Sequence, residues 1–148
     1  MGADVAVFAY SHLLPERALM APIFAAPVRP GEARLVPAVY GLLSGLFKLL
    51  LKLSPERAAA AADRMRRTFD ATDRRIADGR RYLCGDRLTI GDIALCAASA
   101  PLLLPRGYGT PMPPLESLPP VMRTLSEELR AHPTGAFVQR LYDGGFTG

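Results

Sequence analysis

The stretch "RRYLCGDRLTIGDIALCAAS", Arg80 to Ser99, contains the feature that decides how this chain folds. Thr89 suits a helix N-cap, and Asp92 stands three residues later, where its carboxylate can accept a hydrogen bond from the Thr89 N–H. The Thr89 hydroxyl can in turn accept from the Asp92 N–H, which completes a capping box. Leu88 and Ile93 have the spacing of a hydrophobic staple. The pattern predicts that Asp92 starts a helix rather than serving as a catalytic carboxylate.

Helical patterns continue on both sides of this stretch. The clearest covers residues 54–79, with Ser54 as N-cap, Pro55 in the first turn and Gly79 as the stop. Its apolar residues recur at spacings of three and four, at Ala58, Ala62, Met65, Phe69, Thr72 and Ile76. Opposite charges four residues apart predict ion pairs on its other faces, at Asp63/Arg67, Arg66/Asp70, Asp70/Arg74 and Arg74/Asp78.

The remaining segments also indicate helices, because alternation typical of strands is nearly absent. A loop is expected at 25–31, where two prolines and a glycine cluster. The other expected helices are 4–13, 16–25, 32–53, 119–131 and 134–142. The sequence therefore predicts an all-α fold, a single helical-bundle domain of about six helices over residues 1–148, with 143–148 as a loose tail.

Composition narrows the classes of function. The net charge of +4 is modest, and acids interleave with the arginines of 57–87, which argues against nucleic-acid binding. Cys84, Cys96 and the two histidines lack zinc-ligand spacing, so no metal site and no disulfide framework are expected. The uncharged run 35–47 is shorter than the roughly 20 residues of a membrane span. A cytoplasmic protein is the simplest expectation.

A family resemblance rests on three motifs. "RRYLCGDRLTIGDIALCAASAPLLLP" resembles the Tyr-Leu-x-Gly-Asp-x-hydrophobic-Ser/Thr-x-Ala-Asp segment in the C-terminal domain of glutathione S-transferases. "LPPVMRTLSEELRAHPTGAFVQRLY" resembles the closing helices of that domain, and "AYSHLLPER" fits its first part. The resemblance spans roughly 9–142. Gly91 departs from it, since the family usually has Ala at that position.

The resemblance implies the helical, electrophile-pocket domain of a glutathione S-transferase-like protein. The family's thioredoxin-like domain, which binds glutathione and carries the activating residue, is not found in this sequence, so inactivity alone is expected. No catalytic residue and no intrinsic cofactor are assigned; glutathione is expected as co-substrate only if a thioredoxin-like domain is supplied. The resemblance places pocket residues on the first helix and near the central helix, where the candidates are Tyr10, His12, Arg106 and Tyr108.

Two alternatives stay open. The chain could be a non-catalytic module that binds a hydrophobic small molecule or a protein, or a helical protein of the membrane surface. "YGLLSGLFKLLLKL" suits a membrane surface, but a helix this apolar is more often core or oligomer interface, so a membrane is not favoured. Without a thioredoxin-like domain, apolar surface on Ala3 to Phe24 is expected to face water. We therefore expect a homodimer or an association with a glutathione-binding partner.

Overall fold

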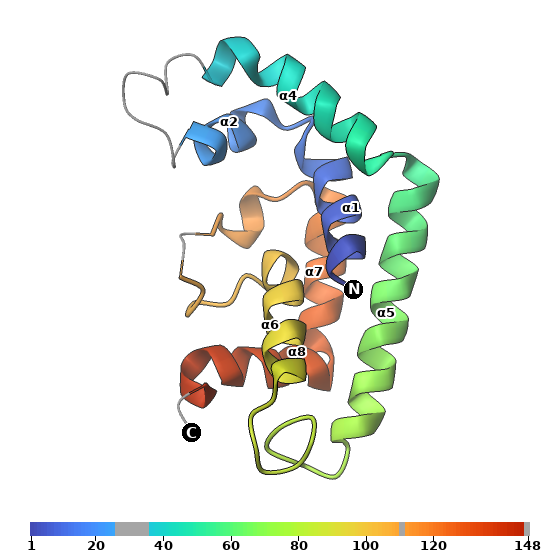
Figure 1. Ribbon diagram of the computed structural model, residues 1–148, viewed down its shortest axis with the longest axis vertical. Coiled ribbons are helices and arrows are strands. Elements are labelled where there is room, and N and C mark those ends of the chain that lie inside the picture. Colours follow the sequence, from blue (N-terminus) through green and yellow to red (C-terminus); the bar gives the residue numbers. More distant parts are fainter. Residues whose placement is uncertain (26–35, 110–111, 147–148) are drawn as a thin grey trace.

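The fold is built from helices that pack side by side, with a helical hairpin at one end (Figure 1). The computed structural model describes residues 1–25, 36–109 and 112–146, and these contain no strand. The expected loop at 25–31 and the start of the expected helix at 32–53 lie mostly outside the described residues. The described elements are α1 (Gly2–Leu13), α2 (Arg17–Ala25), α4 (Val36–Leu51), α5 (Pro55–Ile76), α6 (Ile90–Leu103), η1 (Leu115–Ser117), α7 (Pro120–Ala131), α8 (Pro133–Arg140) and η2 (Leu141–Gly145). The predicted all-α class is confirmed, with seven α-helices among the described residues.

Helix α5 forms one wall of the bundle, and α1 packs mainly against it and against α6 (Figure 1). Its start follows the prediction, because the Ser54 hydroxyl accepts a hydrogen bond from the Arg57 N–H at 3.2 Å and Pro55 is the first helical residue. The predicted stripe faces the core, where Met65 and Phe69 are fully buried. The side chains that meet them from the other helices include Val5, Phe8, Leu102, Leu103, Met122, Leu129 and Val138.

The ion pairs predicted along α5 were wrong. None of the four i,i+4 pairs is among the ion pairs of the described residues. Arg66 instead reaches Asp63 at 3.1 Å and Glu128 of α7 at 2.7 Å, and Arg64 pairs with Asp4 of α1 at 2.6 Å. For Arg66 the packing of α7 on α5 brings Glu128 within reach, and Asp78 pairs with Arg80 in the turn after the helix.

Helix α6 begins at the predicted capping box. One oxygen of the buried Asp92 carboxylate accepts from the Thr89 N–H at 2.8 Å and the Thr89 hydroxyl at 2.6 Å. The other oxygen accepts from the Leu83 N–H at 2.7 Å, so Asp92 also holds the turn that precedes the helix. Leu88 packs against the core whereas Ile93 is 47% exposed, so the staple contact between them stays a prediction.

Helices α7 and α8 meet at the turn formed by His132 and Pro133. Asp73 of α5 joins this turn, since its carboxylate accepts hydrogen bonds from the Thr134 N–H at 2.7 Å, the Thr134 hydroxyl at 2.6 Å and the His132 ring Nδ1 at 2.7 Å. Asp73 therefore caps the start of α8 from a neighbouring helix. Beyond α8 the expected loose tail begins inside η2, and Phe146 packs edge-on against Tyr142 with ring centroids 5.3 Å apart.

Helix α4 packs chiefly on α2 and α1 at one end of the molecule (Figure 1). It ends where Lys52 adopts a left-handed backbone conformation, with φ of 49°. The side chains of Tyr40 and Ser44 in this helix are buried, while five of its large apolar side chains are exposed. Apolar surface on Ala3 to Phe24 was expected to face water, and the outcome differs along the segment. Val5, Val7, Phe8, Ala9, Leu14 and Met20 are buried, whereas Ala3, Pro15 and Ala18 are exposed. None of the described helices combines the length and hydropathy needed to cross a bilayer.

Candidate functional site: an apolar pocket between α1, α5 and α7

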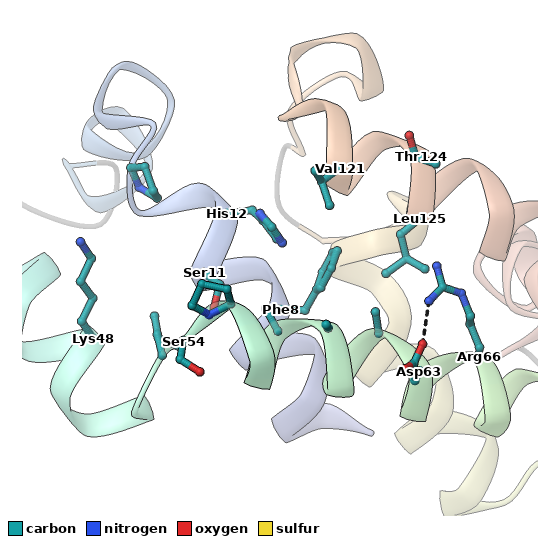
Figure 2. A pocket seen from close by; sticks show the side chains of 16 residues that line it. Phe8, Ser11, His12, Lys48, Ser54, Asp63, Arg66, Val121, Thr124 and Leu125 are labelled. Carbon is teal, nitrogen blue, oxygen red and sulfur yellow. Dashed lines mark hydrogen bonds and ion pairs between the residues drawn. The ribbon is translucent and has the colours of Figure 1, made fainter.

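A pocket of about 830 Å³ opens between α1, the start of α5 and α7, with the end of α4 at its edge. Figure 2 shows Phe8 and His12 reaching it from α1, and Val121 and Leu125 facing them from α7. The volume lies within the range of about 300–1,000 Å³ typical of small-molecule sites. These four side chains come from elements more than a hundred residues apart, so the pocket depends on the packed bundle.

The sequence of α5 explains why this space is not filled. Ala58, Ala59 and Ala62 line the pocket from the first turns of the helix, and alanine side chains reach only a short way across it. Leu53 and Pro55 close the adjoining corner at the turn between α4 and α5. Opposite them Val121 is 56% exposed, although a branched apolar side chain loses free energy by contact with water. The lining thus offers a mostly apolar surface that an apolar ligand would cover.

His12 is the polar side chain that projects furthest among these groups toward the middle of the pocket (Figure 2). Its ring packs edge-on against Phe8, with centroids 4.7 Å apart. Burial lowers the pKa of His12 below its ordinary value of 6.5, because the charged ring loses hydration. At neutral pH the imidazole is therefore uncharged and has one N–H donor and one nitrogen acceptor. Neighbouring Ser11 also lines the pocket, but its Oγ is closed to solvent.

The charged residues lie toward the two ends of the pocket (Figure 2). At one end, Arg66 is held by Asp63 and by Glu128, so its charge is compensated within the protein. At the other end Lys48 extends from α4 into solvent. No carboxylate is placed beside His12 among the residues that line the pocket, so the pocket has no acid–base pair for catalysis.

The four residues predicted to line a pocket are not brought together. His12 lines the pocket described above, whereas Arg106 and Tyr108 line a separate hollow beside η1 together with Arg130. Tyr10 packs against Phe47 of α4, with ring centroids 5.1 Å apart. The sequence places Tyr10 and His12 on one helix, but two residues correspond to about 200° of rotation, so the two side chains point to different neighbours.

Several lining residues escaped the sequence analysis. Val121 and Leu125 have the spacing of ordinary apolar positions in an amphipathic helix. Leu125 is in fact buried in the core, whereas Val121 is exposed. The signal that could have indicated the pocket is the alanine run 58–62, since small side chains on a core-facing helix leave space. That signal is weak, because a neighbouring helix can approach more closely and remove the space.

The two thiols do not form a reactive site with this pocket. Burial raises the pKa of Cys96 to about 12, with a further contribution from the Asp92 charge, so Cys96 is an inert thiol of the core. Cys84 is exposed, and its Sγ lies 3.8 Å from the Arg75 Nη2. Neither cysteine lines the pocket that contains His12.

Among the described residues, Asp70, Asp73 and His132 could offer ligand atoms to a metal ion, within 4.8 Å of one another. Both oxygens of Asp73 already accept hydrogen bonds from Thr134 and His132. Those bonds outweigh the effect of burial and leave the pKa of Asp73 below its ordinary value. The cluster is accounted for as the cap of α8.

Comparison with known proteins finds one similarity, to a family of helical domains. Residues 55–98 match the family model for the C-terminal domain of glutathione S-transferase. The match runs from the start of α5 through the capping box into α6, and it confirms the resemblance seen in the motif around Asp92. No curated protein and no solved structure matches the chain. The chain thus contains a helical domain like the C-terminal domain of glutathione S-transferases.

Proposed function

We propose that this chain is the ligand-pocket domain of a glutathione S-transferase-like protein, and that it binds an apolar small molecule between α1, α5 and α7. The observation that carries the proposal is the pocket of about 830 Å³, with apolar walls from Phe8, Val121 and Leu125 and an uncharged His12 among them. Burial of an apolar ligand there would remove the exposed Val121 surface from water.

The walls define the kind of ligand. Phe8 and Leu125 favour a hydrocarbon or aromatic body, and the neutral His12 ring favours one hydroxyl or carbonyl group on it rather than a charge. In a complete transferase this molecule would be the electrophile. Glutathione would come from a thioredoxin-like domain, because the resemblance assigns glutathione binding and thiol activation to that domain.

We further propose that the described chain performs no conjugation alone. No thiol lines the pocket, and the buried thiol of Cys96 stays protonated at neutral pH because its pKa is about 12. We propose that the chain acts in the cytoplasm, either as a homodimer or together with a separate glutathione-binding chain. Light scattering of the purified protein tests the homodimer directly.

The pocket is tested by filling it. In Ala59→Leu, the larger side chain enters the pocket from α5, and we expect binding of the uncharged fluorophore N-phenyl-1-naphthylamine to weaken about tenfold or more. Ala60→Leu is the matched control, since Ala60 is exposed on the same helix and does not line the pocket. Equal affinity of the two variants in a fluorescence titration would remove the pocket as the binding site.

Calorimetric titration with glutathione tests the proposal that the chain performs no conjugation alone. We expect no heat of binding at ligand concentrations in the millimolar range, where weak sites with Kd of about 1 mM are detected. Saturable binding to the wild-type chain would show that a thiol site exists outside a thioredoxin-like domain. In that case the exposed Cys84 and its neighbour Arg75 become the first positions to substitute.

A further inference from the structure

The outer face of α4 exposes more aliphatic surface than any other described helix. Leu42 is 77% exposed, Leu49 is 74% exposed and Leu50 is 68% exposed. Val39 and Leu46 add to the same side at 41% and 48%. These positions recur at intervals of three and four, which places them on one continuous face of the helix. We call these five side chains the outer face.

A positively charged strip borders the outer face. Gly41, Gly45 and Lys48 follow one another at intervals of four and three, so they form a neighbouring strip of the helix, and Lys52 comes directly after its last residue. A Cβ atom added at Gly41 or at Gly45 would meet nothing within 4 Å, which shows that this strip also borders open space. Val36–Leu51 contains no acidic residue. An aliphatic face bordered by lysines is typical of helices that lie in a membrane interface.

The shape of this surface argues against a protein partner as its occupant. The outer face is a single convex line along one helix at the edge of the molecule (Figure 1), and it comprises five side chains. A stable protein interface takes about 20–30 residues from each partner and draws much of its affinity from aromatic and arginine side chains. The outer face contains no aromatic and no arginine side chain. A fluid bilayer, in contrast, adapts to a convex aliphatic ridge.

Charge argues in the same direction. A second copy docked through α4 would bring together two helices that have lysines and no acids, so no complementary charge would face Lys48 or Lys52. An anionic lipid surface supplies the missing negative charge, and each lysine near such a surface contributes about 1 kcal/mol.

We propose that α4 docks this protein on anionic lipid bilayers, with the outer face in the interfacial region and Lys48 and Lys52 at the headgroups. The helix lies parallel to the membrane plane and does not cross it. The bundle stays on the water side of α4, and the pocket, which Lys48 borders, belongs to this side. This proposal does not rest on ligand binding, because none of the five outer-face residues lines the pocket.

The test is co-sedimentation of the full chain with vesicles of phosphatidylcholine that contain about one third phosphatidylglycerol. The wild-type chain should sediment with these vesicles. Leu42→Ser removes the most exposed side chain of the outer face and should weaken binding about tenfold or more. Lys52→Gln, outside the pocket, should weaken it roughly fivefold and only at low salt.

Ile90→Ser is the matched control, because Ile90 is 85% exposed on α6, far along the chain from α4. It should bind vesicles as the wild type does, and circular dichroism should show all variants folded. Absence of sedimentation by the wild type would overturn the proposal, as would equal binding of Leu42→Ser and the wild type. A wild-type dimer that Leu42→Ser dissociates, without vesicle binding, would assign the outer face to a second copy instead.

Discussion

At the scale of single residues, Asp92 shows how one carboxylate organises a whole segment. Burial raises the pKa of Asp92, but the hydrogen bonds from Leu83 and Thr89 outweigh it and leave the pKa below its ordinary value of 3.8. The ionised group therefore belongs to the folded state. It fixes the first turn of α6 and the preceding turn together, which explains why this motif lies inside the family match.

Asp92→Ala should therefore destabilise the fold strongly. It removes a helix cap and leaves two buried backbone N–H groups without their acceptor, a loss of roughly 2–4 kcal/mol in the free energy of unfolding at neutral pH. Urea denaturation measures it, with Asp86→Ala as the control, since Asp86 is exposed in the same connection. A loss below about 1 kcal/mol would contradict the role given to this carboxylate.

The same variant has a defined pH dependence. Because the pKa of Asp92 is lower in the folded than in the unfolded chain, its ionisation stabilises the fold fully well above 3.8. That contribution is lost as the pH falls from 3.8 toward the lower folded value. The stability difference between wild type and Asp92→Ala should thus shrink in acid. A difference that stays constant down to about pH 2 would contradict this pKa direction.

The residues of this motif were predictable because a capping box is local: both partners lie within one turn, and their geometry follows from spacing. The hydrogen bond from Leu83 was not, since it joins residues nine positions apart through a turn. The ion pairs of α5 failed for the same reason. Arg66 contacts both Asp63, in its own helix, and Glu128, 62 residues away. The second contact depends on how α7 packs against α5.

At the scale of elements, Gly135 sets how closely α8 approaches α7. A Cβ at this position would overlap the carbonyl oxygen of Leu129 and lie 2.9 Å from the Arg130 Cα. No side chain fits there unless the two helices separate. The glycine of the His-Pro-x-Gly turn is thus explained by close packing of backbones rather than by a special backbone conformation.

Gly135→Ala should consequently cost about 1–3 kcal/mol or more of unfolding free energy, as overpacking does. Gly41→Ala offers the contrast, because its Cβ would point into open space within a helix. That substitution should stabilise the protein by about 0.5–1 kcal/mol. Thermal unfolding of both variants measures the two effects. Destabilisation by Gly41→Ala that matches Gly135→Ala would show that packing against α7 is not the cause.

Most elements could be read from the sequence because proline, glycine and capping residues mark their ends. Helix α5 begins at Pro55 as predicted, and α7 and α8 divide at His132 and Pro133. The spacing of apolar residues could not predict which side of α4 packs against the rest of the protein. That helix is apolar on every side apart from Tyr40, Ser44, Lys48 and two glycines, so its pattern does not predict which face is buried.

At the scale of the whole molecule, the central feature is a pocket that no single element encodes. Its walls come from 8–15, 48–66 and 121–125, and its volume depends on how far apart three helices stand. The family resemblance predicted pocket residues on the first helix, and His12 does line this pocket. Arg106 and Tyr108 line another hollow, because the connection after α6 folds away toward η1.

The measurement that tests the proposed pocket most directly is a set of amide correlation NMR spectra recorded during titration with N-phenyl-1-naphthylamine. If the apolar pocket binds ligands, the largest shift changes fall on Ser11, His12, Ala59 and Thr124, and Ala59→Leu abolishes them while Ala60→Leu preserves them. Changes confined to α4, or to Arg106 and Tyr108, would place ligand binding elsewhere and contradict the proposed pocket.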